Sequence, residues 1–173
     1  MMVSDKYLDK LPTLGEIRDS AQFYLIAING EPALHLSKLP SGVEVLGRNN
    51  INNIDLINAF FDPKIKSYKE EKLELNSSNQ GLFVTVNTSA TLHDPLYVCY
   101  VNTLGQSENN NYNLFLLKEL SQINIVEGFW ESDELSACPT STTSSSRFFL
   151  NRGSHLLYHG FGFNQLSANS KFH

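Results

Sequence analysis

Hydrophobic and polar residues follow two different periods along this chain, and the period changes near residue 22. Before that point, apolar residues recur at every third position (Leu11, Leu14 and Ile17), which predicts a short helix over residues 8–21. After it, short runs of β-branched and aromatic residues are separated by glycine, proline and asparagine, a pattern typical of strands joined by turns. We therefore expect the remainder of the chain to be built from strands.

The first strand is predicted at residues 23–28, where β-prone residues run up to Asn29-Gly30. Asn-Gly is a dipeptide that hairpin turns prefer, so residues 33–36 are expected to return as the second strand. Further strands are predicted at residues 43–47, 54–57, 73–75, 82–86 and 96–101. The last of these is the most apolar, and we expect it at the centre of a sheet.

The second half of the chain contains segments with mixed signals. Residues 114–125 fit either a helix, through leucines spaced three apart, or a strand near their end. Residues 105–113 are rich in asparagine and are predicted to form a loop. Residues 136–146 are a low-complexity run rich in serine and threonine, for which we expect a mobile loop. The aromatic segment 147–173 is expected to supply the last strands of the same core.

These elements predict one mostly β domain that spans residues 1–173. A chain of this length buries enough apolar surface to form a core without disulfides or a metal. Many short strands, without alternating long helices, indicate a β-sandwich of short antiparallel strands or a barrel. The expected architecture adds a short N-terminal helix and a long loop insertion to that sandwich.

Composition and charge narrow the possible functions. Hydrophobic residues make up 41% of the chain and charged residues 18%, as in globular proteins. A net charge of -5 argues against non-specific nucleic-acid binding, which needs a basic surface. No apolar run approaches the roughly 20 residues that cross a bilayer, and the N-terminus offers no signal core. We therefore expect an intracellular protein, nuclear or cytoplasmic, that does not contact a membrane.

The two cysteines indicate neither a disulfide framework nor a metal site. Cys99 lies in the most apolar run and is expected to be buried as a small hydrophobe. Cys138 lies in the serine-rich stretch and is expected to be exposed. The spacing does not match a paired-cysteine zinc site, so we predict no cofactor.

A series of short motifs follows the order of a known domain family. Residues 42–48 form a strand that ends in Gly-Arg, an asparagine-rich loop comes next, and residues 53–56 (Asn-Ile-Asp-Leu) then lead to residues 65–67 (Ile-Lys-Ser). Towards the end of the chain, residues 150–157 contain a leucine and a glycine turn, and Gly160, Phe161 and Phe163 follow. This order resembles the forkhead-associated (FHA) domain. The resemblance covers residues 22–165 and implies an FHA-like β-sandwich.

The resemblance implies a protein–protein interaction module that binds phosphothreonine peptides, as in signalling and DNA-damage pathways. An arginine fork and a serine hydroxyl supply the charge-assisted hydrogen bonds that a phosphate dianion needs. The candidate phosphopeptide-binding residues, at or near the family's motif positions, are Arg48, Lys66, Ser67, Lys69, Asn87 and Asn102. Tyr68 and Glu70 stand where the family commonly has arginine and histidine.

Two other functions stay open. If the phosphate site is degenerate, the same loops or an exposed strand edge would bind an unmodified partner by strand addition, as a scaffold or assembly domain. One form of assembly is a homo-oligomer that buries the aromatic tail, namely Phe148, Phe149, Tyr158, Phe161 and Phe163. The alternative is a small β hydrolase or metal-dependent enzyme that uses His93, His155 and His159. Since the chain has no Gly-x-Ser-x-Gly elbow, P-loop or dinucleotide fingerprint, we predict a binding module rather than an enzyme.

Overall fold

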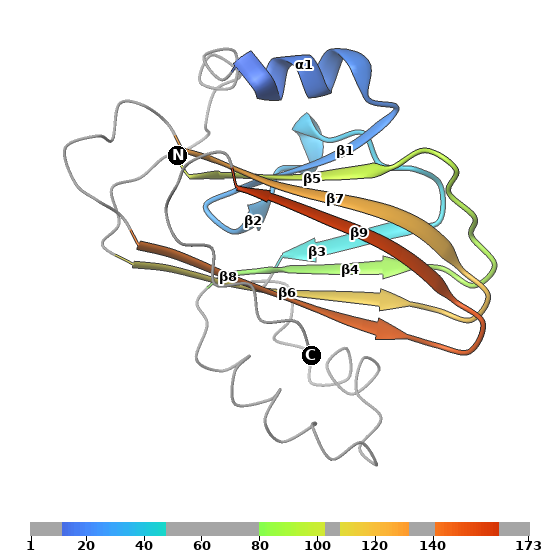
Figure 1. The fold of residues 1–173 in the computed structure, drawn as a ribbon. Coiled ribbons are helices and arrows are strands. Elements are labelled where there is room, and N and C mark those ends of the chain that lie inside the picture. Colours follow the sequence, from blue (N-terminus) through green and yellow to red (C-terminus); the bar gives the residue numbers. More distant parts are fainter. Residues whose placement is uncertain (1–11, 48–79, 103–107, 132–140, 163–173) are drawn as a thin grey trace.

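The computed structural model describes residues 12–47, 80–102, 108–131 and 141–162, and these residues are mostly β (Figure 1). The elements are α1 (Pro12–Ser20), β1 (Phe23–Ile28), β2 (Glu31–Pro32), the 3₁₀ helix η2 (Leu34–Leu36), β3 (Val43–Gly47), β4 (Leu82–Val86), β5 (Leu96–Asn102), β6 (Glu108–Leu117), β7 (Gln122–Glu131), β8 (Ser141–Leu150) and β9 (His155–Gly162). The helix predicted over residues 8–21 is confirmed at Pro12–Ser20 (α1), and residues 8–11 lie outside the described residues.

The strands form two sheets that face each other (Figure 1). The first sheet has the order β2-β1-β5-β7-β9, and the second has the order β3-β4-β6-β8. From β4 onward, each strand and the next form an arch whose two legs lie in different sheets. Leu114 pairs with Arg147 and Ile125 pairs with Tyr158, so the last two arches lie one upon the other in register. We call the arrangement from β4 to β9 the strand stack.

The prediction of antiparallel strands is wrong for the strand stack. The pairs β5–β7 and β7–β9 in the first sheet, and β4–β6 and β6–β8 in the second, are all parallel. Antiparallel pairing joins β1 to β2 and β3 to β4. The physical reason is that each turn of the stack carries the chain across the core to the opposite sheet, so strands that are consecutive in sequence do not become neighbours in one sheet.

Several boundaries match the sequence predictions. β1, β3 and β4 have their predicted bounds, and β5 lies at the centre of the five-stranded sheet. Asn29 and Gly30 both have positive φ (50° and 78°), which confirms the tight turn after β1. The ambiguous segment 114–125 contains the end of β6, a turn and the start of β7. The strands predicted at residues 54–57 and 73–75 lie outside the described residues.

The second predicted strand is wrong in its position. β2 covers only Glu31–Pro32, and Leu34–Leu36 form η2 instead. The hydroxyl of Ser37 accepts the backbone N–H of Ile26 (2.9 Å) and donates to the carbonyl of Ala33 (2.8 Å). This side chain takes the place of a strand partner, and the backbone leaves the sheet.

Two segments that were predicted as loops contain strands. Residues 108–113 of the asparagine-rich segment belong to β6, and residues 141–146 of the low-complexity segment belong to β8. Inside the stack, the side-chain amide of Asn113 donates to the hydroxyls of Ser144 (3.2 Å) and Ser146 (3.4 Å). Polar side chains that satisfy one another replace the apolar contacts by which a strand is normally recognised.

The main core lies between the two sheets. Its buried side chains come from both sheets and include Leu25, Val84, Val98, Tyr100, Phe115 and Ile125. Phe148 of β8 packs against this core, and its ring centre lies 4.9 Å from those of Phe115 and Tyr158. For the described part of the aromatic tail, the prediction that it supplies strands of the same core is therefore confirmed.

A smaller core lies on the outer face of the first sheet, beneath α1 (Figure 1). Leu14 of the helix, Cys99 of β5 and Trp130 of β7 are all buried there. The prediction that Cys99 is buried is confirmed, whereas Cys138 lies outside the described residues. No helix in the described part of the chain is long and apolar enough to cross a membrane.

Candidate functional site at the open end of the strand stack

β8 and β9 each form one edge of their sheet, opposite the edges formed by β3 and β2, and both belong to the last described arch. Within the described residues, no strand pairs with their outer edges. Along such an edge, alternate backbone N–H and C=O groups point away from the sheet, where another strand can pair with them. We call the outer edges of β8 and β9 together the open end.

The outward face of β9 carries histidine and apolar residues in alternation. His155, Leu157, His159 and Phe161 are exposed, and Leu157 and Phe161 expose 53% and 51% of their surface. The intervening Leu156 packs against the main core. Large apolar side chains that stay exposed on an edge strand are typical of a surface that a partner covers. We call the four outward residues the β9 stripe.

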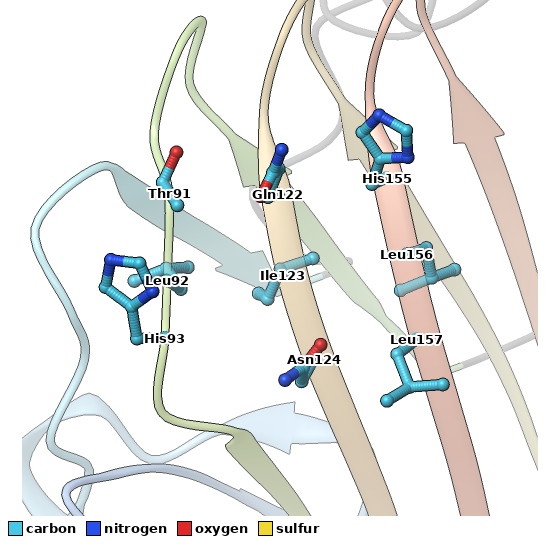
Figure 2. A pocket seen from close by; sticks show the side chains of 9 residues that line it. All are labelled: Thr91, Leu92, His93, Gln122, Ile123, Asn124, His155, Leu156 and Leu157. Carbon is cyan, nitrogen blue, oxygen red and sulfur yellow. The ribbon is translucent and has the colours of Figure 1, made fainter.

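A shallow groove of about 290 Å³ lies at the start of β7 and β9, next to the turn that precedes β5 (Figure 2). Thr91, Gln122 and His155 form one row across it, because they follow one another in the parallel register. The lining side chains are Thr91, Leu92, His93, Gln122, Ile123, Asn124, His155, Leu156 and Leu157. This lining contains no carboxylate, thiol, lysine or arginine.

Two of the three histidines proposed for an enzyme site, His93 and His155, line this groove. His159 lies four residues further along β9 and does not line it. In the part of the chain that the structure describes, no group of three or more histidine, cysteine or acidic side chains is placed to hold a metal ion. The groove offers imidazoles, amides and the hydroxyl of Thr91 for hydrogen bonding, and its lining holds no carboxylate to orient a histidine.

Cys99 does not supply such a nucleophile. It is buried beneath α1, and burial raises the pKa of its thiol to about 12. A thiol acts as a nucleophile only as the thiolate, which needs a lowered pKa and an electropositive setting. Cys99 is therefore a structural residue.

Behind β9, a buried carboxylate joins strands of both sheets. Glu127 of β7 is only 1% exposed. Its Oε1 accepts the hydroxyl of Tyr100 in β5 at 2.7 Å, and its Oε2 accepts the hydroxyl of Tyr158 in β9 at 2.7 Å. The hydroxyl of Ser146 in β8 lies 3.1 Å from Oε1 and 3.0 Å from Oε2. We call these four residues the Glu127 cluster, and through it both strands of the open end are hydrogen-bonded to one carboxylate.

Burial raises the pKa of Glu127 above its ordinary value of 4.5, because the charged form loses its hydration inside the stack. The three hydroxyl donors act in the opposite direction, since they stabilise the carboxylate, but their effect is smaller. No lysine or arginine among the described residues contributes to the shift. Burial, and then the charge of Glu127, raise the pKa values of Tyr100 and Tyr158, so both phenols stay protonated as donors.

Gly160 makes the contact between Tyr158 and Glu127 possible. It pairs with Glu127 in the register of β7 and β9 and therefore lies beside the carboxylate-bearing residue. A Cβ atom at Gly160 would lie only 3.0 Å from the phenol oxygen of Tyr158. Because this atom is missing, the phenol has room to reach Oε2 of Glu127.

The hydrophobic pattern of the sequence did not identify the Glu127 cluster, although the position of Glu127 within that pattern is one signal for the cluster. Ile123, Ile125 and Glu127 stand at alternate positions of β7 and therefore face the same side of the strand. Both isoleucines are buried in the core. A single acidic residue on the inward face of an apolar strand needs hydrogen-bond donors from other strands. The sequence offers no means to find those donors, because they come from β5, β8 and β9.

The predicted phosphopeptide residues are not brought together in the described part of the chain. Four of them lie outside it, namely Arg48, Lys66, Ser67 and Lys69. Asn87 follows β4, where its side chain donates to Glu44 and accepts from Lys118, each at 2.9 Å. Asn102 is the last residue of β5 and is buried. Since β4 and β5 are the two legs of one arch, Asn87 and Asn102 lie at opposite ends of the strands.

Comparison with known proteins adds no family to this geometry, because no family model and no curated protein matches the sequence. The resemblance to the FHA domain stays a prediction, and so does the phosphothreonine site. The described residues define a β protein of two mixed sheets whose last arch carries an open end.

Proposed function

We propose that this protein is a protein–protein interaction module that assembles by strand addition at the open end. The observation that carries this proposal is that one edge strand of each sheet, β8 or β9, comes from the same arch and has no strand on its outer edge in the described part of the chain. An added strand would satisfy the outward backbone groups, and its own side chains would pack beside the apolar side chains of the β9 stripe.

The composition of the two edge strands supports this function. Natural edge strands are usually protected from pairing by lysine or proline. β8 (STTSSSRFFL) and β9 (HLLYHGFG) contain neither residue, and Arg147 carries their one formal charge. Both strands are therefore suited to accept a further strand.

A second copy of the chain is the partner that we expect at this surface. Two copies related by a two-fold axis perpendicular to the sheets would place β9 antiparallel to β9 and β8 antiparallel to β8. Strands with so little formal charge oppose few like charges when each meets its own copy. Both sheets would then continue through the dimer.

A reversible dimer of the chain is the expected state. Sedimentation equilibrium over a range of protein concentrations measures its dissociation constant. Leu157→Lys places a charge within the β9 stripe, where it would meet the same charge of the second copy. We expect the dissociation constant to rise by at least about tenfold, equivalent to ~1.4 kcal/mol.

Leu34→Lys is the matched control. Leu34 has a similar exposed fraction (49%), but it lies in η2, which packs against β1. This variant should leave the dissociation constant unchanged. A wild-type chain that stays monomeric at every concentration, or a dimer that Leu157→Lys leaves intact, would show the proposed function to be wrong.

Phosphothreonine binding, which the FHA resemblance implies, differs from strand addition in one measurable respect. Strand addition uses backbone hydrogen bonds, so its affinity does not depend on phosphate. A phosphothreonine peptide library that binds the chain, with binding lost in the unphosphorylated library and in Arg48→Ala, would establish the phosphopeptide module instead.

A further inference from the structure

Both strands of the open end are attached to one buried group. Tyr158 of β9 and Ser146 of β8 donate to the carboxylate of Glu127, and Tyr100 of β5 is the third donor. Glu127 lies in β7, one strand inside the edge, and the residue beside it in β9 is Gly160. Because glycine has no side chain, the phenol of Tyr158 takes its place and reaches the carboxylate.

Tyr158 is itself only partly covered. One side of its ring packs against Phe148, with ring centres 4.9 Å apart, and the residue is half-buried. Glu127, by contrast, is almost completely buried. Since β9 is an edge strand, a strand added beside it would cover more of the Tyr158 side chain and would exclude water from the neighbourhood of Glu127.

We infer that strand addition at the open end is linked to protonation of Glu127, so that assembly is tighter at lower pH. This regulation presupposes the assembly function proposed above. An added strand removes the water nearest to Tyr158 and Ser146, the two donors that β9 and β8 provide. Loss of that water disfavours the charged carboxylate, so the assembled form holds a proton on Glu127 more tightly than the free chain does.

The sign of the linkage follows from the direction of the shift. Burial raises the pKa of Glu127 above 4.5 in the free chain, and further burial by an added strand raises it again. Between the two pKa values, assembly takes up a proton, and the affinity therefore increases as the pH falls through that window. Each copy of the chain contributes one Glu127, so a dimer takes up at most two protons, and the change is limited to about a hundredfold per pH unit.

The side chains that face Glu127 do not change their own protonation state in the pH window between its two pKa values. Within the described residues, the titratable side chains that face it are Tyr100 and Tyr158, and burial raises the pKa of both. β8 contributes the hydroxyl of Ser146, and β6 contributes the amide of Asn113 through that hydroxyl. The arginine that follows Ser146 in β8 points to the opposite face of the strand.

The two histidines of the β9 stripe would produce a pH dependence of the opposite sign. Covering His155 or His159 with an added strand disfavours the charged imidazole. Assembly would then weaken as the pH falls. The direction of the pH dependence therefore distinguishes Glu127 from the histidines.

Sedimentation equilibrium of the full chain at a series of pH values, from about 5 to about 8, tests this linkage. For the wild-type chain, the dimer dissociation constant should fall with falling pH, by up to about a hundredfold per pH unit for the two Glu127 residues of the dimer. Glu127→Gln removes the ionisable group and should remove this dependence. Tyr158→Phe removes a hydrogen-bond donor that stabilises the charged carboxylate of Glu127. The change of the dissociation constant with pH should therefore occur at higher pH.

A chain that carries both His155→Gln and His159→Gln should keep the pH dependence of the dissociation constant, even if the two substitutions change the affinity of the dimer. A wild-type dissociation constant that is independent of pH, or a dependence that persists in Glu127→Gln, overturns the linkage and leaves the assembly function standing. A chain that is monomeric at every pH overturns both. If circular dichroism shows that Glu127→Gln does not fold, the direction of the shift in Tyr158→Phe decides the question.

Discussion

Glu127 is surrounded by hydroxyl groups instead of basic side chains, and these partners determine how it responds to pH. A lysine or arginine partner would lower the pKa of the carboxyl group, whereas three hydroxyl donors offset only part of the effect of burial. The carboxylate is therefore satisfied in its hydrogen bonds but costly to ionise. Its role is to hold β5, β8 and β9 together through Tyr100, Ser146 and Tyr158.

Glu127→Gln should change how the stability of the chain depends on pH. The pKa of Glu127 is higher in the folded chain than its ordinary value of 4.5. Its contribution to stability is therefore complete below that value and is lost as the pH rises through the folded pKa, at no more than about 1.4 kcal/mol per pH unit. In urea unfolding at several pH values, the wild type should lose stability relative to Glu127→Gln as the pH rises. Parallel pH profiles of the two proteins would contradict this expectation.

Among the elements, β6 and β8 show how a strand can carry polar residues on its inward face. Asn113 of β6 accepts the backbone N–H of Leu82 at 3.1 Å, and its amide donates to Ser144 and Ser146 of β8. These bonds run across β4, β6 and β8, which are neighbours in the second sheet. An asparagine-rich or serine-rich segment is therefore ordered here by side-chain hydrogen bonds that cross from strand to strand.

The attachment of β9 depends on the absence of a side chain at Gly160. In Gly160→Ala, the new Cβ lies 3.0 Å from the phenol oxygen of Tyr158, so the ring must move and its hydrogen bond to Glu127 is weakened or lost. Loss of a hydrogen bond to a buried charged group costs roughly 1–3 kcal/mol. Urea unfolding of the variant should show a decrease of this size in the free energy of unfolding.

Gly15→Ala is the matched control for this glycine substitution. Nothing lies within 4 Å of a Cβ atom at Gly15, which is in the middle of α1. Alanine is favoured over glycine inside a helix by about 1 kcal/mol, so this variant should be more stable than the wild type. If both substitutions changed stability in the same direction, the packing at Gly160 would not be the cause.

In the whole molecule, each arch of the strand stack covers the one before it. The last arch places Phe148 on Phe115 and places Tyr158 beside Glu127, so it closes the core at β6 and β7. In stacked architectures of this kind, stability is the sum of contacts between neighbouring units, and the last unit has one uncovered side. That uncovered side is the open end, which we propose as the assembly surface.

Deletion of residues 147–173 tests whether the last arch belongs to the core. The deletion removes the last four of the ten residues of β8 and all of β9, and it would expose the apolar side chains of β6 and β7 that they cover. We expect the shortened chain not to fold, as measured by circular dichroism and gel filtration. A folded monomer would contradict this and would favour the hypothesis that the aromatic tail serves assembly alone.

Local pattern was sufficient to predict the features that depend on residues close together in the chain. The bounds of β1, β3 and β4, the turn at Asn29-Gly30 and the helix before residue 22 follow from β-propensity, turn chemistry and helical spacing. The central place of β5 and the burial of Cys99 follow from the apolar run in which both lie. These features are confirmed because each is a property of a short segment.

Contacts between distant segments decided the remaining features. The period-two pattern of a strand records which side chains face inward, but it carries no information on which strand lies alongside, so parallel arches and antiparallel hairpins have the same pattern. The polar inward faces of β6 and β8, and the donors to Glu127, depend on partners from other strands. Asn113 and Glu127 are buried where hydrogen-bond partners from other strands satisfy them, and those partners come together only in the folded chain.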